Sequence, residues 1–262
     1  MSNGSRVECG DLNVMVSAKH GRMLVNRHDI YIGRSILELG EFSEGEVDLL
    51  SQVVRPGAVV VEAGANIGTH TLPLARLVGP SGRVFAMEPQ RIVFQLLCAN
   101  MALNSVTNVV ATCQAVGAKA GQLKVPHIDY SQPNNFGGLG LEGREHGDDV
   151  PVVTIDSLNL HRLDLIKADV EGMETAVLSG ALNTIQRCHP LLYVENDREE
   201  KSQALLSLMK ELGYVPYAHS PPLYSPNNYF GQATNPFGNI VSMNVFAVHS
   251  SVTANIQGMK QL

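Results

Sequence analysis

The chain has 262 residues, a formal net charge of -6 and 17% charged residues. This length lies near the upper limit for a single α/β core, so we expect one domain overall. An acidic chain lacks the positive charge with which general nucleic-acid binders hold phosphates, so that class is excluded. The four cysteines are far apart and include no C-x-x-C pair, which predicts neither a zinc site nor a disulfide framework.

The beginning of the chain shows neither a membrane nor a secretory pattern. No apolar run approaches the ~20 residues of a membrane helix, and residues 1–5 lack a basic and then apolar signal. We therefore expect a cytoplasmic protein that binds no membrane. Residues 1–42, with short β-like pieces at 12–16 and 29–32, are interpreted as a cap segment over the ligand end of a sheet. Ser43 then precedes a helical pattern, and residues 43–262 form the main domain.

The chain is organised around residues 58–71. Residues 58–63 are almost wholly apolar, as in a strand buried on both faces, and residues 69–78 have the apolar spacing of a helix. Between them, Gly64 and Gly68 allow a sharp turn and let a ligand approach the main chain closely. The pattern predicts a strand, a tight turn and a helix start, with a nucleotide-like ligand at the turn.

Two carboxylates distinguish between nucleotide-like ligands. Glu62 lies at the tip of the first strand, and Glu88 ends the second strand, 83–89, about 20 residues beyond the glycine turn. A dinucleotide fingerprint needs a glycine where Asn66 stands, and a carboxylate at the strand tip would repel pyrophosphate. S-adenosylmethionine instead presents an ammonium, a sulfonium and a ribose diol, all of which suit acidic neighbours.

The remaining apolar segments complete an α/β pattern. Helices are expected at 92–103 and 199–212, and strands at 108–113, 150–155, 163–169, 190–195, 214–218 and 243–248, with an irregular stretch at 117–150. The last strand follows a long loop without a crossover helix, so it should run antiparallel. The predicted fold is a Rossmann-like, doubly wound α/β domain whose seven-stranded sheet is mostly parallel with an antiparallel last strand.

The tip of strand 163–169 is the expected chemical end of the sheet. Ligands of doubly wound sheets bind beyond the carboxyl ends of the strands, at the switch point where this strand neighbours the first. Asp169 should therefore lie close to the reacting atoms, because a carboxylate there has no structural need. Glu171 is either a second catalytic carboxylate or a favourable acid at the start of the next helix. His146 and His219 are mobile alternatives for proton transfer.

Four segments resemble the Rossmann-like methyltransferases, and the FkbM family in particular. They are residues 61–68, 87–89, 153–158 and 167–174, in the family's order, with Glu62 standing where many relatives carry Asp. The resemblance implies S-adenosylmethionine as the cofactor. In such enzymes the segment 114–116 usually lines the adenine edge, although an ordinary strand end explains it equally well. The residues expected to bind the cofactor are Glu62, Gly64, Asn66, Gly68, Thr69, Glu88, Pro89, Ala115, Val116 and Asp169.

A magnesium site is an alternative use of the strand-tip acids. Asp169 at the fourth strand, with Glu195 and Asn196 at the fifth, resembles the layout by which catechol O-methyltransferases hold magnesium through oxygen ligands. The neighbouring base lysine of those enzymes has no counterpart, because Gly172 and Met173 follow. Mg²⁺ is therefore the weaker hypothesis.

The function predicted from the sequence is S-adenosylmethionine-dependent O-methylation. The FkbM resemblance suggests a hydroxylated small molecule as acceptor, a sugar or a secondary metabolite. Two alternatives stay open, a nicotinamide-dependent oxidoreductase and a catalytically inactive S-adenosylmethionine-binding partner protein. No nucleic-acid partner is expected, and the sequence leaves open whether the protein is a homo-oligomer.

Overall fold

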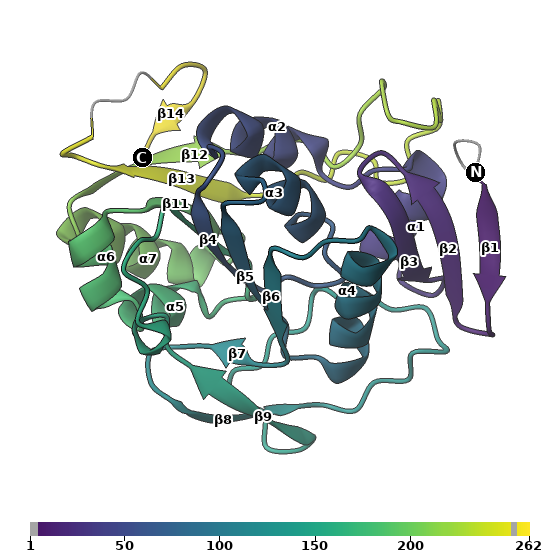
Figure 1. Cartoon of the computed structure of the whole chain (residues 1–262), viewed down its shortest axis with the longest axis horizontal. Helices are drawn as coiled ribbons and strands as arrows, with labels where there is room; N and C mark the ends of the chain where they lie inside the picture. Colours follow the sequence, from purple (N-terminus) through teal and green to yellow (C-terminus); the bar gives the residue numbers. More distant parts are fainter. Residues whose placement is uncertain (1–4, 253–255) are drawn as a thin grey trace.

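The main sheet of the protein has eight strands. They are β4 (Val59–Ala63), β5 (Arg83–Met87), β6 (Val109–Thr112), β10 (Leu165–Ala168), β11 (Leu191–Glu195), β12 (Tyr214–His219), β13 (Asn244–His249) and β14 (Lys260–Gln261). In the computed structural model, which describes residues 5–252 and 256–262, their order is β14-β12-β13-β11-β10-β4-β5-β6 (Figure 1). Strands β6, β5, β4, β10 and β11 run parallel to one another.

The predicted Rossmann-like α/β fold is confirmed, with one addition to the sheet. The strand expected at 243–248 is β13, which is antiparallel to both of its neighbours, β11 and β12. The sheet has eight strands instead of seven because the two-residue β14 pairs with β12 at one edge. The switch point falls between β4 and β10, where the strand order reverses, so a ligand is expected beyond their carboxyl ends.

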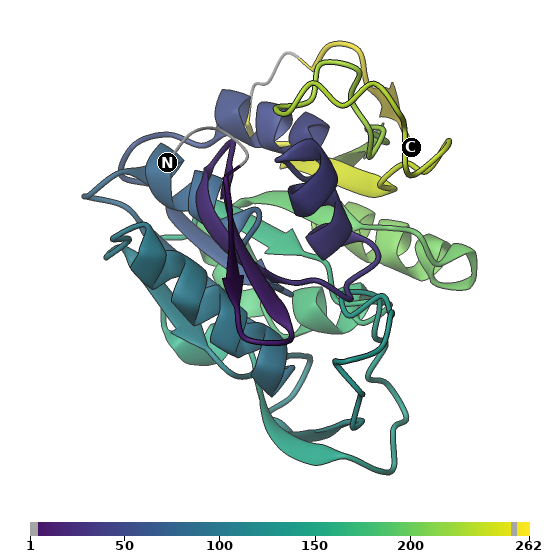
Figure 2. The ribbon, with the colours of Figure 1, turned by 90° about the vertical axis from the view of Figure 1, so that its right-hand side faces the viewer.

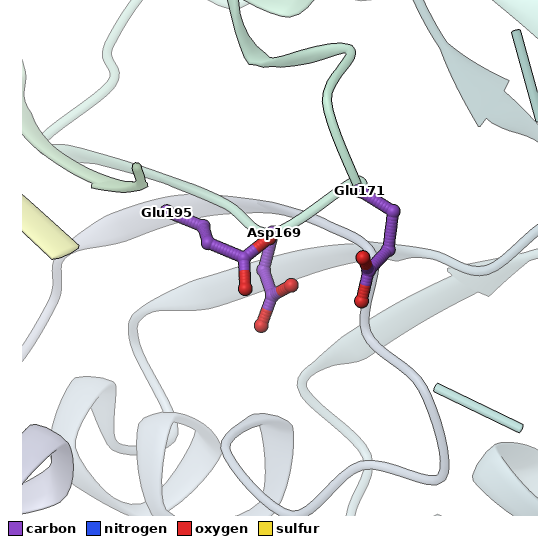
Figure 3. Close-up of side chains that lie close together, drawn as sticks. All are labelled: Asp169, Glu171 and Glu195. Carbon is purple, nitrogen blue, oxygen red and sulfur yellow. The ribbon is translucent and has the colours of Figure 1, made fainter. Parts of the chain in front are cut away.

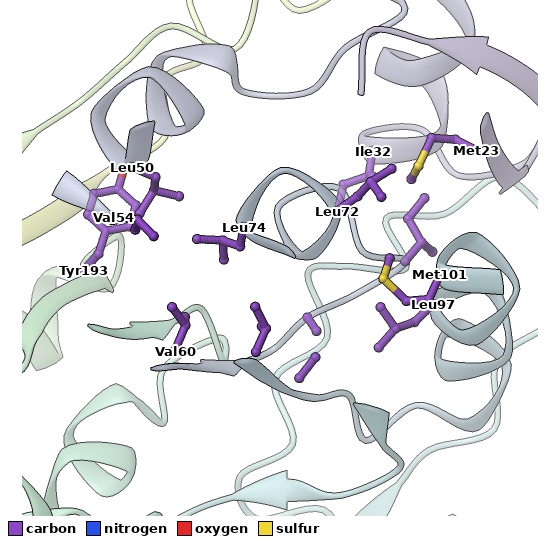
Figure 4. Close-up of a cluster of buried hydrophobic side chains, with 14 of the residues drawn as sticks. Met23, Ile32, Leu50, Val54, Val60, Leu72, Leu74, Leu97, Met101 and Tyr193 are labelled. Carbon is purple, nitrogen blue, oxygen red and sulfur yellow. The ribbon is translucent and has the colours of Figure 1, made fainter. Parts of the chain in front are cut away.

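Helices cover both faces of this sheet. They are α1 (Ile32–Leu39), α2 (Glu44–Val53), α3 (Thr71–Val78), α4 (Arg91–Leu103), α5 (Glu174–Ser179), α6 (Leu182–Cys188) and α7 (Glu199–Glu211), with a 3-10 turn at Asp156–Leu158. Val60 of β4 belongs to the same buried cluster as Leu72 of α3 and Leu97 of α4 (Figure 4). The next residue, Val61, faces the other side and packs with Leu178 of α5. As the apolar run predicted, β4 is buried on both faces.

The N-terminal segment forms a small antiparallel sheet followed by a helix. Strands β1 (Arg6–Cys9), β2 (Asn13–Ala18) and β3 (Gly21–Asn26) lie beside α4 (Figure 2). The β-like piece expected at 29–32 is wrong, because α1 begins at Ile32. The helical spacing of Ile32, Ile36 and Leu39 gives α1 a buried apolar side, which stabilises it in place of a strand.

Two asparagines, Asn100 in the last turn of α4 and Asn104 just after the helix, close the free edge of β3. The Oδ1 atom of Asn100 accepts the N–H of Leu24 (2.6 Å), and its amide donates to the Leu24 carbonyl (3.1 Å). One helical turn further, Asn104 makes the same pair of hydrogen bonds with the main chain of Arg22, at 2.9 and 2.7 Å. The two side chains therefore stand where the peptide groups of another strand would pair.

Residues 117–150 are more regular than predicted. Strands β7 (Ala115–Val116), β8 (Gly121–Val125) and β9 (Asp148–Val153) form a separate sheet in the order β7-β9-β8. The strand expected at 150–155 is thus the middle strand of this small sheet. Among the helices of the described ranges, none has the length and apolar character needed to cross a membrane.

Candidate active site

A cavity of about 430 Å³ opens beyond the carboxyl ends of β4, β10 and β11. Its wall contains Gly64 from the turn after β4, Asp169 from the end of β10 and Glu195 from the end of β11. A second cavity of about 40 Å³ adjoins it, since Gly64, Glu88 and Asp169 line both. Both cavities therefore lie at the switch point of the sheet, the expected place for a ligand.

The turn after β4 approaches the end of β10 very closely. Gly64 has a φ of 78°, and a Cβ atom there would lie 1.7 Å from the carbonyl oxygen of Asp169. Only glycine fits this position. Asn66 also has a positive φ, 49°, and is held by its N–H, which donates to the Glu88 carboxylate at 2.9 Å. Glu88 thereby connects the tips of the first two strands.

The Glu88 carboxylate is buried and only partly used by the protein. It accepts main-chain N–H groups from Asn66 and, at 2.8 Å, from Gln90. Burial is the main reason that the pKa of Glu88 is raised to about 7, while the two main-chain donors act in the opposite direction. A hydrogen-bonding ligand that reached this carboxylate would favour its charged form.

A buried lysine in the wall of the larger cavity compensates the acids around it. Lys167 is 2% exposed, and its Nζ lies 3.7 Å from Oδ2 of Asp169. Burial lowers its pKa, but the carboxylates of Asp169, Glu46 and Glu62 outweigh that effect and raise it above the ordinary value. Glu62 accepts the Thr71 hydroxyl at 2.6 Å, and burial raises its pKa to about 7. The carboxylate of Glu62 therefore lies in the protein interior, beside Lys167.

Three carboxylates converge at the ends of β10 and β11. Asp169, Glu171 and Glu195 each offer an oxygen atom, and these atoms lie within 4.8 Å of one another (Figure 3). Glu171 is paired with the Arg198 guanidinium. Its pKa is raised to about 7, first by burial and then by the charge of Asp169. Burial and the same charge raise the pKa of Glu195 to about 11. This close set of acids can hold shared protons or a cation.

Most of the residues predicted to bind the cofactor line one of the two cavities. The wall of the larger cavity includes Gly64, Asn66, Thr69, Glu88 and Asp169, and that of the smaller includes Pro89, Ala115 and Val116. Glu62 and Gly68 line neither. Gly68 has a φ of 89° and faces Leu97, so a glycine here allows the turn and leaves room for α4 to pack against it. Asn196 also lines neither cavity, and its N–H donates to the carbonyl of Met243. The acid cluster therefore contains two of the three residues predicted to hold magnesium, Asp169 and Glu195, with Glu171 in place of Asn196.

Several polar residues of the larger cavity were not predicted. His70 and Asn244 are 4% and 8% exposed, and Glu46 is 4% exposed. Burial lowers the pKa of His70 to about 3, so its imidazole is neutral. The histidines that were considered lie elsewhere: His146 is exposed on a loop, and His219 bonds the Tyr193 hydroxyl at 2.9 Å. Only the place of His70 within the turn motif, two residues after Gly68, could have indicated it.

A doubly wound sheet with a glycine turn, strand-tip carboxylates and an antiparallel strand beside β11 is the architecture of Rossmann-like methyltransferases. The chain belongs to the FkbM methyltransferase family. The family model described as "Methyltransferase FkbM domain" matches residues 62–216, more than half of the chain. The resemblance carried by the sequence motifs is thereby confirmed.

Relatives from several organisms align with large parts of the chain. Methyltransferase sdnD of Sordaria araneosa is 28% identical over 158 residues, which are 46% of this chain and 59% of that protein. The 31-O-demethyl-FK506 methyltransferase FkbM of Streptomyces tacrolimicus is 26% identical over 205 residues, which are 66% of this chain and 78% of that protein. The crystal structure of Methyltransferase FkbM from Methylobacillus flagellatus KT aligns with a TM-score of 0.47 and 17% identity, over 76% of this chain and 50% of that one. The chain thus spans less than two thirds of the Sordaria protein.

Proposed function

We propose that the protein transfers a methyl group from S-adenosylmethionine to a hydroxyl oxygen of a small molecule. The observation that carries this proposal is the position of Glu88, a buried carboxylate that ties the glycine turn to the second strand and still lines both cavities. A carboxylate accepts hydrogen bonds from a ribose diol. A nicotinamide dinucleotide also has such a diol, but Asn66 stands where its pyrophosphate turn needs a glycine, and Glu62 adds a carboxylate at the strand tip, so the turn argues against that cofactor.

The remaining walls also fit this cofactor. Ala115 and Val116 give the smaller cavity an apolar side suited to a flat adenine ring, and Asp169 joins the two cavities. The acids around Asp169 suit a sulfonium and an ammonium group. When bound, the cofactor supplies a methyl group on a positively charged sulfur, which makes that carbon open to attack.

Asp169 is the residue best placed to assist the acceptor. A hydroxyl oxygen that attacks the methyl carbon must lose its proton, and a carboxylate at the junction of the two cavities can receive it. The bond from oxygen to carbon forms as the bond from carbon to sulfur breaks, and the proton passes to Asp169. Glu171 is less available as a base because Arg198 already binds its carboxylate. Much of the acceleration should come from alignment of acceptor and donor.

We propose a small molecule as the acceptor in preference to a nucleic acid. The net charge of -6 and the carboxylates around the cavity would repel a phosphate backbone. The relative from Streptomyces tacrolimicus is named for 31-O-demethyl-FK506, a demethylated oxygen site on a small molecule. This name supports oxygen as the atom that receives the methyl group, in a secondary metabolite or a sugar.

Calorimetry with S-adenosylhomocysteine and with NAD tests the proposal directly. We expect saturable binding of S-adenosylhomocysteine and none of NAD at the same concentrations. Transfer of labelled methyl to a panel of hydroxylated metabolites then tests turnover. Binding of NAD alone would favour the oxidoreductase, whereas binding of S-adenosylhomocysteine with no transfer to any member would favour the inactive partner protein.

A further inference from the structure

Three large apolar side chains are exposed together in the wall of the larger cavity. Ile240, Val241 and Met243 are 39%, 41% and 44% exposed, and all three line this cavity. In the described part of the chain five other large apolar side chains are also exposed, but none of the five lines either cavity. Exposed apolar side chains that gather at one cavity indicate a binding surface, whereas single ones are ordinary. We refer to Ile240, Val241 and Met243 as the apolar rim.

The main chain of the apolar rim is fixed by hydrogen bonds. The carbonyl of Ile240 accepts the N–H of Leu223 at 3.0 Å. The N–H of Ser242 donates to the carbonyl of Pro221, also at 3.0 Å, and the Ser242 hydroxyl lies 3.1 Å from that of Ser43. The apolar side chains are therefore exposed on a backbone that is already in place, and a ligand that covers them has no segment to order first.

The loop that carries the apolar rim, residues 220–243 between β12 and β13, packs on α1 (Figure 1). Leu223 and Phe237 of the loop form a buried cluster with Leu39 at the end of α1. The N–H of Phe230 donates to the carbonyl of Leu39 at 3.0 Å. The loop thus has its own apolar anchor in the protein, and the three exposed side chains of the rim are left over from that packing.

The N-terminal segment supplies further apolar side chains to the same cavity. Tyr31, Ile32 and Phe42 line it, together with the apolar rim. The acids of the cavity come from the strand ends instead, as Asp169 after β10 and Glu195 of β11 show. The cavity therefore combines a charged part at the strand ends with an apolar part that two distant segments of the chain build.

We propose that the apolar rim, with Tyr31 and Phe42, holds an apolar skeleton of the methyl acceptor. The inference rests on the proposed function and deepens it, because it favours a hydroxyl on a largely hydrocarbon framework over a sugar. A sugar carries hydroxyls on all sides, and each one buried against these side chains without a partner costs about a factor of ten in affinity. The side chains line a cavity and not a flat face, which fits a small molecule better than a protein partner.

The first test measures how affinity depends on the size of the apolar part. Binding of butanol, hexanol and octanol to the wild type saturated with S-adenosylhomocysteine is followed by saturation-transfer NMR, with methyl glucoside as the polar comparison. Affinity should rise toward octanol by about fourfold for each added methylene that is buried, and methyl glucoside should bind more weakly than hexanol. Equal affinity for the three alcohols, or tighter binding of methyl glucoside, would overturn the inference.

The second test assigns this affinity to the apolar rim. Val241→Thr keeps the shape of the side chain but replaces a methyl group by a hydroxyl, so octanol should bind about tenfold more weakly. The matched control is Val110→Thr, because Val110 of β6 is 37% exposed but lies outside both cavities, and it should leave octanol binding unchanged. Both variants should melt within about 2 °C of the wild type, since both valines are exposed.

Met243→Gln repeats the measurement at a second position of the rim. Wild-type affinity for octanol in both Val241→Thr and Met243→Gln would overturn the inference, and so would an equal loss in Val110→Thr. Sedimentation with phosphatidylcholine vesicles that Val241→Thr abolishes would assign the rim to a membrane surface, which also overturns it.

The two proposals fail in different ways. If S-adenosylhomocysteine does not bind the wild type, the proposed function is wrong, and the rim has no acceptor to hold. If it binds and labelled methyl is transferred, but to methyl glucoside in preference to the alcohols, only the apolar acceptor is wrong. We also expect Val241→Thr to retain the wild-type affinity for S-adenosylhomocysteine. A tenfold loss would assign Val241 to the cofactor and contradict its role toward the acceptor.

Discussion

Glu88→Ala should weaken binding of S-adenosylhomocysteine strongly. Under the proposed function this carboxylate accepts a charge-assisted hydrogen bond from the ribose, a contact that contributes about 1.5–3 kcal/mol. That free energy corresponds to a dissociation constant raised by roughly 10–150-fold. The substitution also leaves the N–H groups of Asn66 and Gln90 without their acceptor, which loosens the glycine turn in the same direction. The upper part of the range is therefore expected.

The pH dependence of binding gives a second signature of Glu88. Burial raises its pKa to about 7 in the ligand-free protein, and the ligand favours the charged carboxylate. Affinity in the wild type should then rise between pH 6 and pH 8, and Glu88→Ala should remove that part of the rise. Calorimetry at both pH values measures this, with Glu211→Ala, on an exposed carboxylate of α7, as the control. Affinity of Glu88→Ala within twofold of the wild type would refute the reasoning.

Three further perturbations address the acids and the turn. Asp169→Asn should lower the rate of labelled-methyl transfer by ~10²-fold or more, while the affinity for S-adenosylhomocysteine changes much less. An equal fall of rate and affinity would mean that Asp169 only neutralises the positive charge of the donor. Excess chelator should leave methyl transfer unchanged, because Lys167 and Arg198 already compensate the carboxylates of Asp169 and Glu171. Inactivation by chelator that added Mg²⁺ reverses would establish the metal site instead. Gly64→Ala should lower the melting temperature far more than Gly79→Ala. Both glycines have a positive φ, but of the two only Gly64 faces an atom within 4 Å. Similar shifts of the two variants in differential scanning fluorimetry would contradict the close approach.

Local patterns in the sequence were sufficient for the central sheet. The apolar run at 58–63 and the glycines after it predicted β4 and its turn because burial on both faces leaves a continuous apolar signal. The antiparallel β13 followed from the absence of a crossover helix. The strand-tip acids Glu88 and Asp169 were likewise visible, since their places depend only on where two strands end.

The parts that were missed depend on contacts between distant segments. Asn244 becomes part of the site only because β13 inserts between β11 and β12, which places it opposite Glu195. The carboxylate of Asp156, at the start of its own 3-10 turn, accepts N–H groups from Asn183 and Thr184 at the start of α6, a pairing that no local pattern indicates. The inward turn of the Glu62 side chain toward Thr71 was likewise not visible in the sequence. No local spacing reveals which partner a polar side chain finds.

The two asparagines at the end of α4, Asn100 and the capping residue Asn104, affect how copies of the protein can meet. Each engages both main-chain groups of alternate residues of β3, Leu24 and Arg22, so that edge offers no free ladder to another chain. Removing the amides would leave a short row of unpaired N–H and C=O groups at the margin of a three-stranded sheet. Variants at Asn100 and Asn104 should therefore aggregate through strand addition at concentrations where the wild type stays dispersed. The asparagine amides therefore keep the edge of β3 from pairing with a strand of another copy of the protein.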